Sequence, residues 1–431
     1  MILLKNILLD GSKVDIVIDG GLIRKIVPEG TWDQLLKLPA QEDLAAGLAS
    51  GAEVMDCGGK TAVPGFINMH THAAMTLMRG IQEDVAFHQW LAGIWNFETR
   101  LDADFVYWGT KVACLEMIRT GTTTFNDQYW FSPVAHKAAV EMGIRPVISY
   151  VILDQDNPEE AARQREQCQE MYEESLGWKD GSLFSVSVHA VYSVSEAMIG
   201  WAADFARKYG LKLHLHLSET EKENADCLAK TGLTPTAYLD RLGALGPDTI
   251  AAHCLWLTED DIALLGRRKV NCVHNINSNL KLSSGYRFPY EELRDAGANV
   301  CIGTDGAASS NNLDVLEAMK TSALLQKAIR KNPESLPIPE LLAMATSNGA
   351  RALGLRTGRI EEGMAADLSI VDTDNSFFLS PGSFLANFIY SAHSDCIDSV
   401  IAKGRFVMKN RVVAGEKELL SNARKMLHLM Y

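Results

Sequence analysis

The chain has 431 residues, of which 47% are hydrophobic, so it is long enough for more than one ordinary domain and can bury a large core. Its 41 basic and 54 acidic residues give a formal net charge of −13 with no local cluster of Lys and Arg, which argues against nucleic acid as a partner. No run approaches the roughly 20 apolar residues that span a bilayer, and the opening lacks the pattern of a secretory signal, so we expect no membrane partner.

The two ends of the chain are predicted to form short strands that belong together. Apolar and polar residues alternate through 2–30 ("ILLKNILLDG", "KVDIVIDGGLIRKIV") and through 366–415 ("ADLSIVD", "SVIAKGRFVMKNRVV"). Because chain ends tend to lie close together, residues 1–60 and 356–431 are expected to combine into one small sheet domain. Residues 31–52, rich in Leu, Ala and Gly, have the composition of an insertion in that domain.

Between the two ends, the sequence alternates between strand-like and helix-like segments. Eight short β-rich runs occur at 61–68, 122–127, 145–153, 183–191, 211–218, 249–254, 270–275 and 299–305. Most are separated by helical patterns such as "DADFVYWGTKVACLEMIRTG", which opens with acidic residues and ends at Gly121. Eight strands alternating with helices predict an α/β fold, namely a parallel (β/α)8 barrel of the TIM type over residues 61–355.

The eight cysteines are predicted to be reduced core residues. They are scattered without a CxxC pair, and several lie within apolar runs such as "VNCV" and "NVCIG". This usage is typical of cytosolic proteins rather than of disulfide frameworks or zinc–thiolate sites, so we expect a cytoplasmic protein.

Histidines and carboxylates gather at the ends of the predicted strands, where barrel enzymes carry their chemistry. The first strand ends in "NMHTH", and His70 and His72, two positions apart on a strand, point to the same face. The later strand ends carry His189, His216, His253, His274 and Asp305. A single histidine of this kind is more often a hydrogen-bonded structural residue, but five strand ends together favour a site for zinc or another divalent first-row metal.

Several of these stretches resemble the amidohydrolase superfamily of metal-dependent hydrolases, namely "PGFINMHTH", "HLSE", "AHC" and "GTDG". Longer stretches such as "HTHAAMTLMRG", "MIRTGTTTFND" and "LHLHLSET" look like its branch of 5′-methylthioadenosine/S-adenosylhomocysteine deaminases. The resemblance covers nearly the whole chain and implies a small β-sandwich domain built from both chain ends beside the barrel. One departure is "HNINSNLKLSSG", where the family usually has a proline at Ile276 and a small residue at Asn277.

The resemblance implies one divalent metal ion, expected to be zinc, with iron or manganese as alternatives. In the family, the ligand on the fifth strand precedes a glutamate by three residues, which in "KLHLHLSETE" corresponds to His216. His70, His72 and Asp305 would complete the ligand set. His214 points to the same face about 7 Å further down the strand, so we expect a packed, hydrogen-bonded histidine there rather than a ligand.

The resemblance also implies the roles of the remaining polar residues. Glu219 would give a proton to a ring nitrogen of the substrate, His253 would orient the attacking water, and Asp305 would accept the proton of that water. Glu219 and Asp305 would therefore contact the substrate as well as take part in the chemistry. Glu98 would accept hydrogen bonds from ribose hydroxyls, and His189 would contact the nucleoside.

The implied activity is hydrolytic deamination of adenine nucleosides, with release of ammonia and an inosine-type product. We expect 5′-methylthioadenosine, S-adenosylhomocysteine or adenosine as the small-molecule substrate. One alternative is a related hydrolase that acts on another aminated or halogenated heterocycle, such as a triazine, a pterin or a guanine-like base. Another is a scaffold protein that kept the barrel and lost the chemistry. A homo-oligomer is compatible with the sequence.

Overall fold

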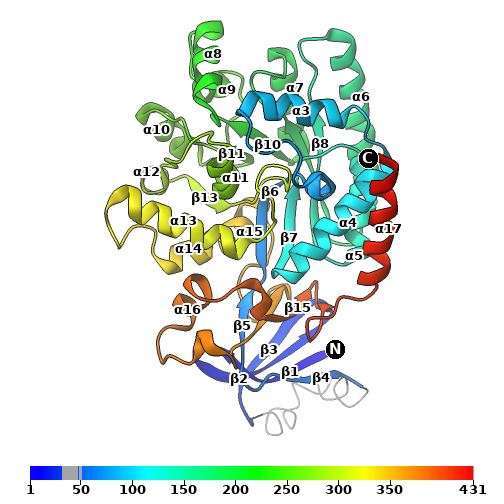
Figure 1. Ribbon diagram of the computed structural model, residues 1–431, viewed down its shortest axis with the longest axis vertical. Helices are drawn as coiled ribbons and strands as arrows, with labels where there is room; N and C mark the ends of the chain where they lie inside the picture. Colours follow the sequence, from blue (N-terminus) through cyan, green and yellow to red (C-terminus); the bar gives the residue numbers. More distant parts are fainter. Residues whose placement is uncertain (32–46, 48–50, 431) are drawn as a thin grey trace.

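The protein is described here by a computed structural model, which covers residues 1–31, 47 and 51–430 (Figure 1). The predicted insertion at 31–52 lies almost entirely outside these described residues. Two separate sheets organise the chain: a parallel barrel, and a mixed sheet built from both chain ends, which lies below the barrel in Figure 1.

Eight parallel strands form a nearly closed barrel, in agreement with the predicted architecture. In chain order they are β6 (Phe66–Thr71), β7 (Thr122–Asp127), β8 (Arg145–Ile152), β9 (Leu183–Val188), β10 (Lys212–Leu217), β11 (Thr249–His253), β12 (Asn271–His274) and β13 (Asn299–Ile302). Each strand pairs with the next. The first and last strands meet where the backbone N–H groups of Thr304 and Asp305 both donate to the carbonyl oxygen of His70, at 3.1 and 3.0 Å.

The first predicted strand, 61–68, is divided between the two sheets, which corrects that prediction. β5 (Lys60–Pro64) pairs antiparallel with β14 (Leu368–Asp372) and touches β1 (Ile2–Leu9), so it belongs to the sheet of the chain ends. Gly65 joins β5 to β6, and a Cβ at Gly65 would lie 2.4 Å from side-chain atoms of Thr123. Both strands are buried, so the apolar run continues across the junction and hydrophobic periodicity does not reveal the change of sheet.

The two chain ends form one mixed sheet, as the alternating patterns at both ends predicted. Its further strands are β2 (Ser12–Asp19), β3 (Leu22–Pro28), β4 (Glu53–Asp56), β15 (Ile397–Ala402) and β16 (Arg405–Met408). The strand order is β16-β15-β14-β5-β1-β2-β3, with β4 paired to β1. The N-terminal and C-terminal parts therefore meet at the pairing of β5 with β14.

Helices cover the outside of the barrel (Figure 1). Those between the barrel strands are α3 (Phe87–Glu98), α4 (Ala103–Arg119), α5 (Ser132–Met142), α6 (Pro158–Ser175), α7 (Glu196–Tyr209), α8 (Glu221–Thr231), α9 (Pro235–Arg241), α10 (Glu259–Arg268), α11 (Ile276–Lys281) and α12 (Tyr290–Ala296), with the 3₁₀ helix η2 (Ala73–Met78). Those after the last strand are α13 (Val315–Arg330), α14 (Ile338–Ala345), α15 (Ser347–Leu353), α16 (Phe384–Tyr390) and α17 (Glu416–Met430). Within the described residues, no helix combines the length and the apolar character needed to cross a membrane.

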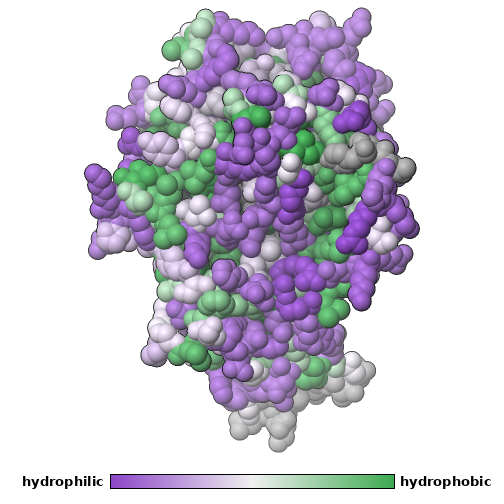
Figure 2. Space-filling model, viewed as in Figure 1, coloured by the Kyte–Doolittle hydropathy of each residue, from purple (hydrophilic) through white to green (hydrophobic). Residues whose placement is uncertain are grey.

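The last helix packs alongside a helix of the barrel. α17 runs alongside α4 (Figure 1), and its Ala423 and Met426 are buried in the same apolar cluster as Phe105 and Val106. The residues predicted as one domain at 356–431 therefore divide between the two parts of the molecule. On the face shown in Figure 2, hydrophilic residues predominate and hydrophobic ones are interspersed among them, as is normal for a protein surface.

All eight cysteines are buried and none forms a disulfide, as predicted. Burial raises the pKa of the Cys57 thiol to about 12, and burial also raises the pKa of Cys114, Cys168 and Cys301. Thiols held in the protonated form away from solvent are poor nucleophiles and poor metal ligands. The cysteines therefore contribute to packing in this fold.

A buried ion pair joins the barrel to the sheet. Arg145, at the N-terminal end of β8, donates to Asp367 Oδ2 at 2.5 Å, and the side chains of the two residues are 8% and 0% exposed. We expect Arg145→Met to lower the free energy of unfolding by about 3–5 kcal/mol, because the carboxylate is left buried without its partner. Kinetic constants should stay near those of the wild type, because catalysis in such barrels occurs at the opposite ends of the strands.

Denaturant unfolding measures this effect as the free energy of unfolding of Arg145→Met, with Lys222→Ala as the control variant. Lys222 forms an exposed pair with Asp226, so its loss should cost less than about 1 kcal/mol. Equal effects of the two variants on the free energy of unfolding would contradict the structural role of Arg145.

Candidate functional site

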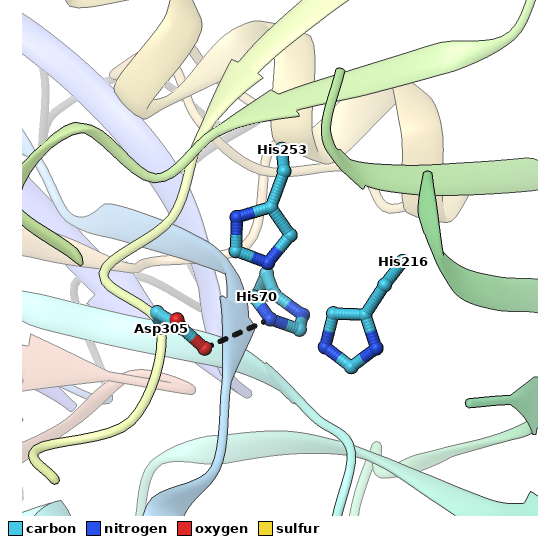
Figure 3. A group of neighbouring side chains, drawn as sticks. All are labelled: His70, His216, His253 and Asp305. Atoms are coloured by element: carbon cyan, nitrogen blue, oxygen red, sulfur yellow. Dashed lines mark hydrogen bonds and ion pairs between the residues drawn. The ribbon is translucent and has the colours of Figure 1, made fainter. Parts of the chain in front are cut away.

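Histidines and an aspartate from different strands meet at the C-terminal end of the barrel. Ligand atoms of His70, His216, His253 and Asp305 all lie within 4.8 Å of one another (Figure 3). His70 Nε2 lies 3.1 Å from Asp305 Oδ1, and His72 Nε2 lies at the same distance from the same oxygen. The structure thus brings together all four residues predicted as metal ligands, together with His253.

The backbone fixes the orientation of two of these imidazoles. The Nδ1 of His72 lies 2.6 Å from the carbonyl oxygen of Gln128, and the Nδ1 of His216 lies 2.8 Å from the carbonyl oxygen of His189. A carbonyl oxygen can only accept, so each Nδ1 carries the proton and donates it. In a neutral ring the lone pair is then on Nε2, which is the arrangement that a metal-binding histidine requires.

His214 is a packed, hydrogen-bonded histidine, as predicted. It is fully buried, and its Nε2 is hydrogen-bonded to His70 Nδ1 at 2.9 Å. Its Nδ1 lies 3.2 Å from Asn126 Nδ2. Both ring nitrogens are therefore engaged by protein groups, and His214 supports the ring of His70 from below the cluster.

The donor set fits a divalent first-row ion. Burial lowers the pKa of His70 to about 4 and that of His216 well below its usual value, so both rings are neutral, as ligands must be. Burial opposes ionisation of Asp305, but hydrogen bonds to His70 and His72 hold the pKa of that carboxyl well below its usual range. Burial opposes protonation of His72, but its hydrogen bond to Asp305 raises the pKa of that ring to about 9. An ion that takes the place of this proton would leave three neutral imidazoles around one carboxylate, a set suited to zinc and related metals.

The loop after β12 supplies partners for two of the site residues, and sequence reasoning missed them. Asp305 Oδ2 accepts from Ser278 Oγ at 2.6 Å and from Ser309 Oγ at 2.9 Å. His253 Nδ1 is hydrogen-bonded to Asn279 Oδ1 at 2.8 Å. Ser278 and Asn279 lie on α11, within the "HNINSN" stretch that departs from the family pattern. Polar residues directly after a strand end were the available signal.

Glu219 faces the cluster as a buried carboxylic acid. The residue is 8% exposed, and its Oε1 lies 3.7 Å from His253 Nδ1. Burial raises the pKa of Glu219 well above its usual value, and the charge of Asp305 raises it further. Both effects favour the protonated form, in which the side chain can act as a proton donor. His253, with a φ of 76°, and Asp305, with a φ of 61°, have left-handed backbones, a form of strain common at functional sites.

Two connected hollows adjoin the cluster. The inner pocket is lined by residues of the cluster and by residues predicted to contact the substrate. They include His72, Glu98, His189, Glu219, His253 and Asp305. It shares Trp95, Glu98 and Tyr129 with a second cavity of about 730 Å³, which extends between α3, β8 and α6. Burial raises the pKa of Glu98, against hydrogen bonds to Tyr129 and Trp130 that lower it. Glu98 therefore stands where the two hollows meet.

Some aromatic and histidine residues that are close to the site in sequence lie outside it in the structure. Of the aromatic residues near Glu98, Phe87, Trp90 and Trp95 line the inner pocket, whereas Phe97 is buried and packs against another phenylalanine. His274, the last residue of β12, is stacked on a phenylalanine ring with the ring centroids 4.1 Å apart, and it does not join the cluster.

Comparison with known proteins agrees with this geometry. The sequence profile of the amidohydrolase family matches residues 61–407. A 5′-deoxyadenosine deaminase of Methanoregula boonei is 44% identical over 372 residues, covering 86% of this chain and 84% of the relative. The 5-methylthioadenosine/S-adenosylhomocysteine deaminase 1 of Archaeoglobus fulgidus is 39% identical over 403 residues, covering 93% and 95%.

A solved structure extends the similarity to three dimensions. The crystal structure of an adenosine deaminase from Xanthomonas campestris with bound zinc has a TM-score of 0.88 and 32% identity, covering 97% of this chain and 93% of that one. The family profile spans most of the chain, and each of these three relatives matches 86% or more of the chain. The chain therefore belongs to the amidohydrolase family of enzymes.

Proposed function

We propose that this chain is a metal-dependent hydrolytic deaminase of adenine nucleosides that carry different groups at the 5′ position. One observation carries the proposal: the buried Glu219, whose pKa is raised well above its usual value, and the carboxyl group of Glu98 line the same pocket as His72, His216, His253 and Asp305. The first suits proton delivery to a purine ring, and the second suits the hydroxyls of a ribose. The names of the relatives from Methanoregula boonei and Archaeoglobus fulgidus support the same class of substrate.

His70, His72, His216 and Asp305 would hold the ion, which we expect to be zinc. When bound, such an ion lowers the pKa of a coordinated water toward neutrality. Asp305 would accept the proton of that water. Two hydrogen bonds support this role, because Ser278 and Ser309 hold its Oδ2 and leave Oδ1 facing the cluster.

The remaining side chains act on the substrate. His253, held by Asn279, would orient the water for attack on the amine-bearing carbon of adenine. Glu219 would protonate the adjacent ring nitrogen, so that ammonia leaves and an inosine-type product remains. His189, whose pKa burial lowers to about 3, is neutral and would contact the nucleoside.

The second cavity accounts for substituents at the 5′ position. It begins at Glu98, where the ribose would bind, and its volume of about 730 Å³ leaves room for a methylthio or homocysteinyl group. We therefore propose 5′-methylthioadenosine, S-adenosylhomocysteine and 5′-deoxyadenosine as substrates, ahead of adenosine.

Ammonia release from a panel of compounds tests the proposal. The panel contains the four nucleosides together with guanine, a pterin and an aminated triazine. We expect each 5′-substituted nucleoside to be deaminated with a higher kcat/KM than any free base. Faster turnover of a triazine or a pterin than of every nucleoside would replace this proposal with the related-hydrolase alternative.

Replacing Glu98 tests the recognition of ribose. We expect Glu98→Ala to lower kcat/KM for 5′-methylthioadenosine by at least about 2 kcal/mol, or roughly 30-fold, because the two ribose hydroxyls lose a charged acceptor. The 2′-deoxy analogue should be a poor substrate for the wild type and no worse for the variant. Unchanged discrimination between adenosine and free adenine in Glu98→Ala would remove Glu98 from ribose binding.

A further inference from the structure

A second buried glutamate, Glu223, stands directly behind the catalytic Glu219. Glu223 is 4% exposed and belongs to the first turn of α8. Its Oε1 accepts from the backbone N–H of Ser218 at 2.9 Å, and its Oε2 accepts from the backbone N–H of Glu219 at 2.8 Å. The two oxygens of one carboxylate therefore hold the two successive peptide groups that lead into the proposed proton donor.

This arrangement differs from an ordinary helix cap. In a capping box, the third helical residue reaches back to the backbone N–H of the N-cap residue itself. α10 shows that pattern, because Asp261 accepts from the backbone N–H of its own N-cap, Thr258, at 2.9 Å. In α8 the N-cap is Thr220, yet Glu223 bypasses it and binds the two preceding residues. Its carboxylate thus serves the strand-end loop and not the cap.

The segment of Ser218 and Glu219 also connects the end of β10 to the end of β11 through hydrogen bonds. Ser218 has a left-handed backbone with a φ of 49°, a conformation that costs free energy and needs external support. Its carbonyl oxygen accepts from the backbone N–H groups of Leu255 and Trp256 at 3.1 and 3.0 Å. Those residues follow His253 closely, so one rigid turn sets the position of Glu219 relative to His253.

We propose that Glu223 is a positioning residue that fixes the carboxyl group of Glu219 for proton transfer, by holding the peptide N–H groups of Ser218 and Glu219. This proposal deepens the proposed deaminase function and rests on it. A donor displaced by about 1 Å can cost as much as a hundredfold in rate, so loss of one of the two bonds should act mainly on kcat.

A double-mutant cycle tests this role. We expect Glu223→Gln to lower kcat for 5′-methylthioadenosine by about 10- to 100-fold, with KM changed less than about threefold. In a Glu219→Gln background the same change should alter kcat by less than about twofold, since there is no proton donor left to position. An equal loss in both backgrounds, or an unchanged kcat in the wild-type background, would overturn the proposal.

Asp261→Asn is the matched control for stability. Asp261 is also a buried carboxylate in the first turn of a helix that follows a barrel strand, but it holds only its own cap and Thr234. Both variants should lower Tm, and only Glu223→Gln should lower kcat. If Glu223→Gln does not fold, Glu223→Asp takes its place, because the shorter side chain keeps the charge and reaches at most one of the two N–H groups.

Hydrogen exchange separates this inference from the proposed function. The amide protons of Ser218 and Glu219 should both exchange slowly in the wild type, and at least one of them should exchange at least about tenfold faster in Glu223→Gln, with the later turns of α8 unchanged. This measurement needs no substrate. If the wild type deaminates no nucleoside, the proposed function fails while the contact is still tested. Equal exchange in the two proteins would overturn the contact itself.

Discussion

Replacing His70, His72 or His216 with Ala is expected to abolish deaminase activity and to remove most of the bound metal. Each of these rings presents Nε2 to the cluster or lies within reach of Asp305. A site of three imidazoles and one carboxylate that loses a protein ligand binds its ion far more weakly, and the acidity of the attacking water is lost with the ion.

His214→Ala is the control, because it lies on the same strand face as His216 and differs only in depth. Its two ring nitrogens are bound by His70 and Asn126. We expect a loss of about 2–4 kcal/mol in the free energy of unfolding, from the cavity and from the unpaired nitrogen of His70. Loss of a supporting partner typically lowers metal affinity by about 10–100-fold, so the ion should remain bound when it is added at saturating concentration.

Metal content of the purified variants, together with ammonia release after addition of zinc, measures both effects. His216→Ala should stay inactive at saturating zinc, and His214→Ala should recover activity. If His214→Ala strips the metal and His216→Ala retains it, the assignment of the ligand on β10 is reversed. Full metal content in all the variants would remove the cluster from metal binding.

The barrel and the gathering of polar residues could be predicted because both follow from local pattern and topology. Strand-like runs alternate with helices, and the C-terminal ends of parallel strands meet at one end of a barrel. Residues as distant in sequence as His70 and Asp305 therefore had to lie close together. The prediction that His214 and His216 share one face of their strand followed from the two-residue repeat of a strand.

The supporting contacts could not be predicted because they depend on loop conformations. Ser278 and Asn279 reach Asp305 and His253 only because α11 begins immediately after β12. Glu223 reaches Ser218 only because the backbone of Ser218 is left-handed. Hydrophobic periodicity carries no information about such turns.

The division at Gly65 and the docking of α17 were missed for a related reason. Buried strands of either sheet have the same apolar composition, so the sequence pattern shows that a segment is buried and not which sheet it joins. The amphipathic pattern of α17 likewise predicts a helix with one apolar face, but not the surface that covers this face. In the structure that surface includes α4.

Glu219→Gln is expected to lower kcat by about 10²–10⁴-fold while the protein keeps its metal. The carboxamide has nearly the shape of the carboxylic acid, so packing around the 8% exposed side chain should be preserved. An amide N–H is far too weak an acid to protonate a purine ring nitrogen, whereas burial raises the pKa of Glu219 and so favours the protonated carboxyl group that can do so. The effect should therefore fall on the chemical step and leave KM for 5′-methylthioadenosine within about threefold.

Glu221→Gln provides the matched control, since Glu221 is an exposed glutamate two residues further along the same segment. Its kcat should equal that of the wild type. Single-turnover measurement of inosine-type product, with metal content determined on the same samples, separates loss of the proton donor from loss of the ion.

Near-normal turnover in Glu219→Gln would assign the proton to another group. Of the residues that line the inner pocket, only Asp305 and Glu98 also carry a carboxyl group. The pKa of Asp305 is held well below its usual range, so it is ionised and is a poor acid, and Glu98 lies toward the second cavity. We therefore expect no other carboxyl group of the inner pocket to compensate for the loss of Glu219.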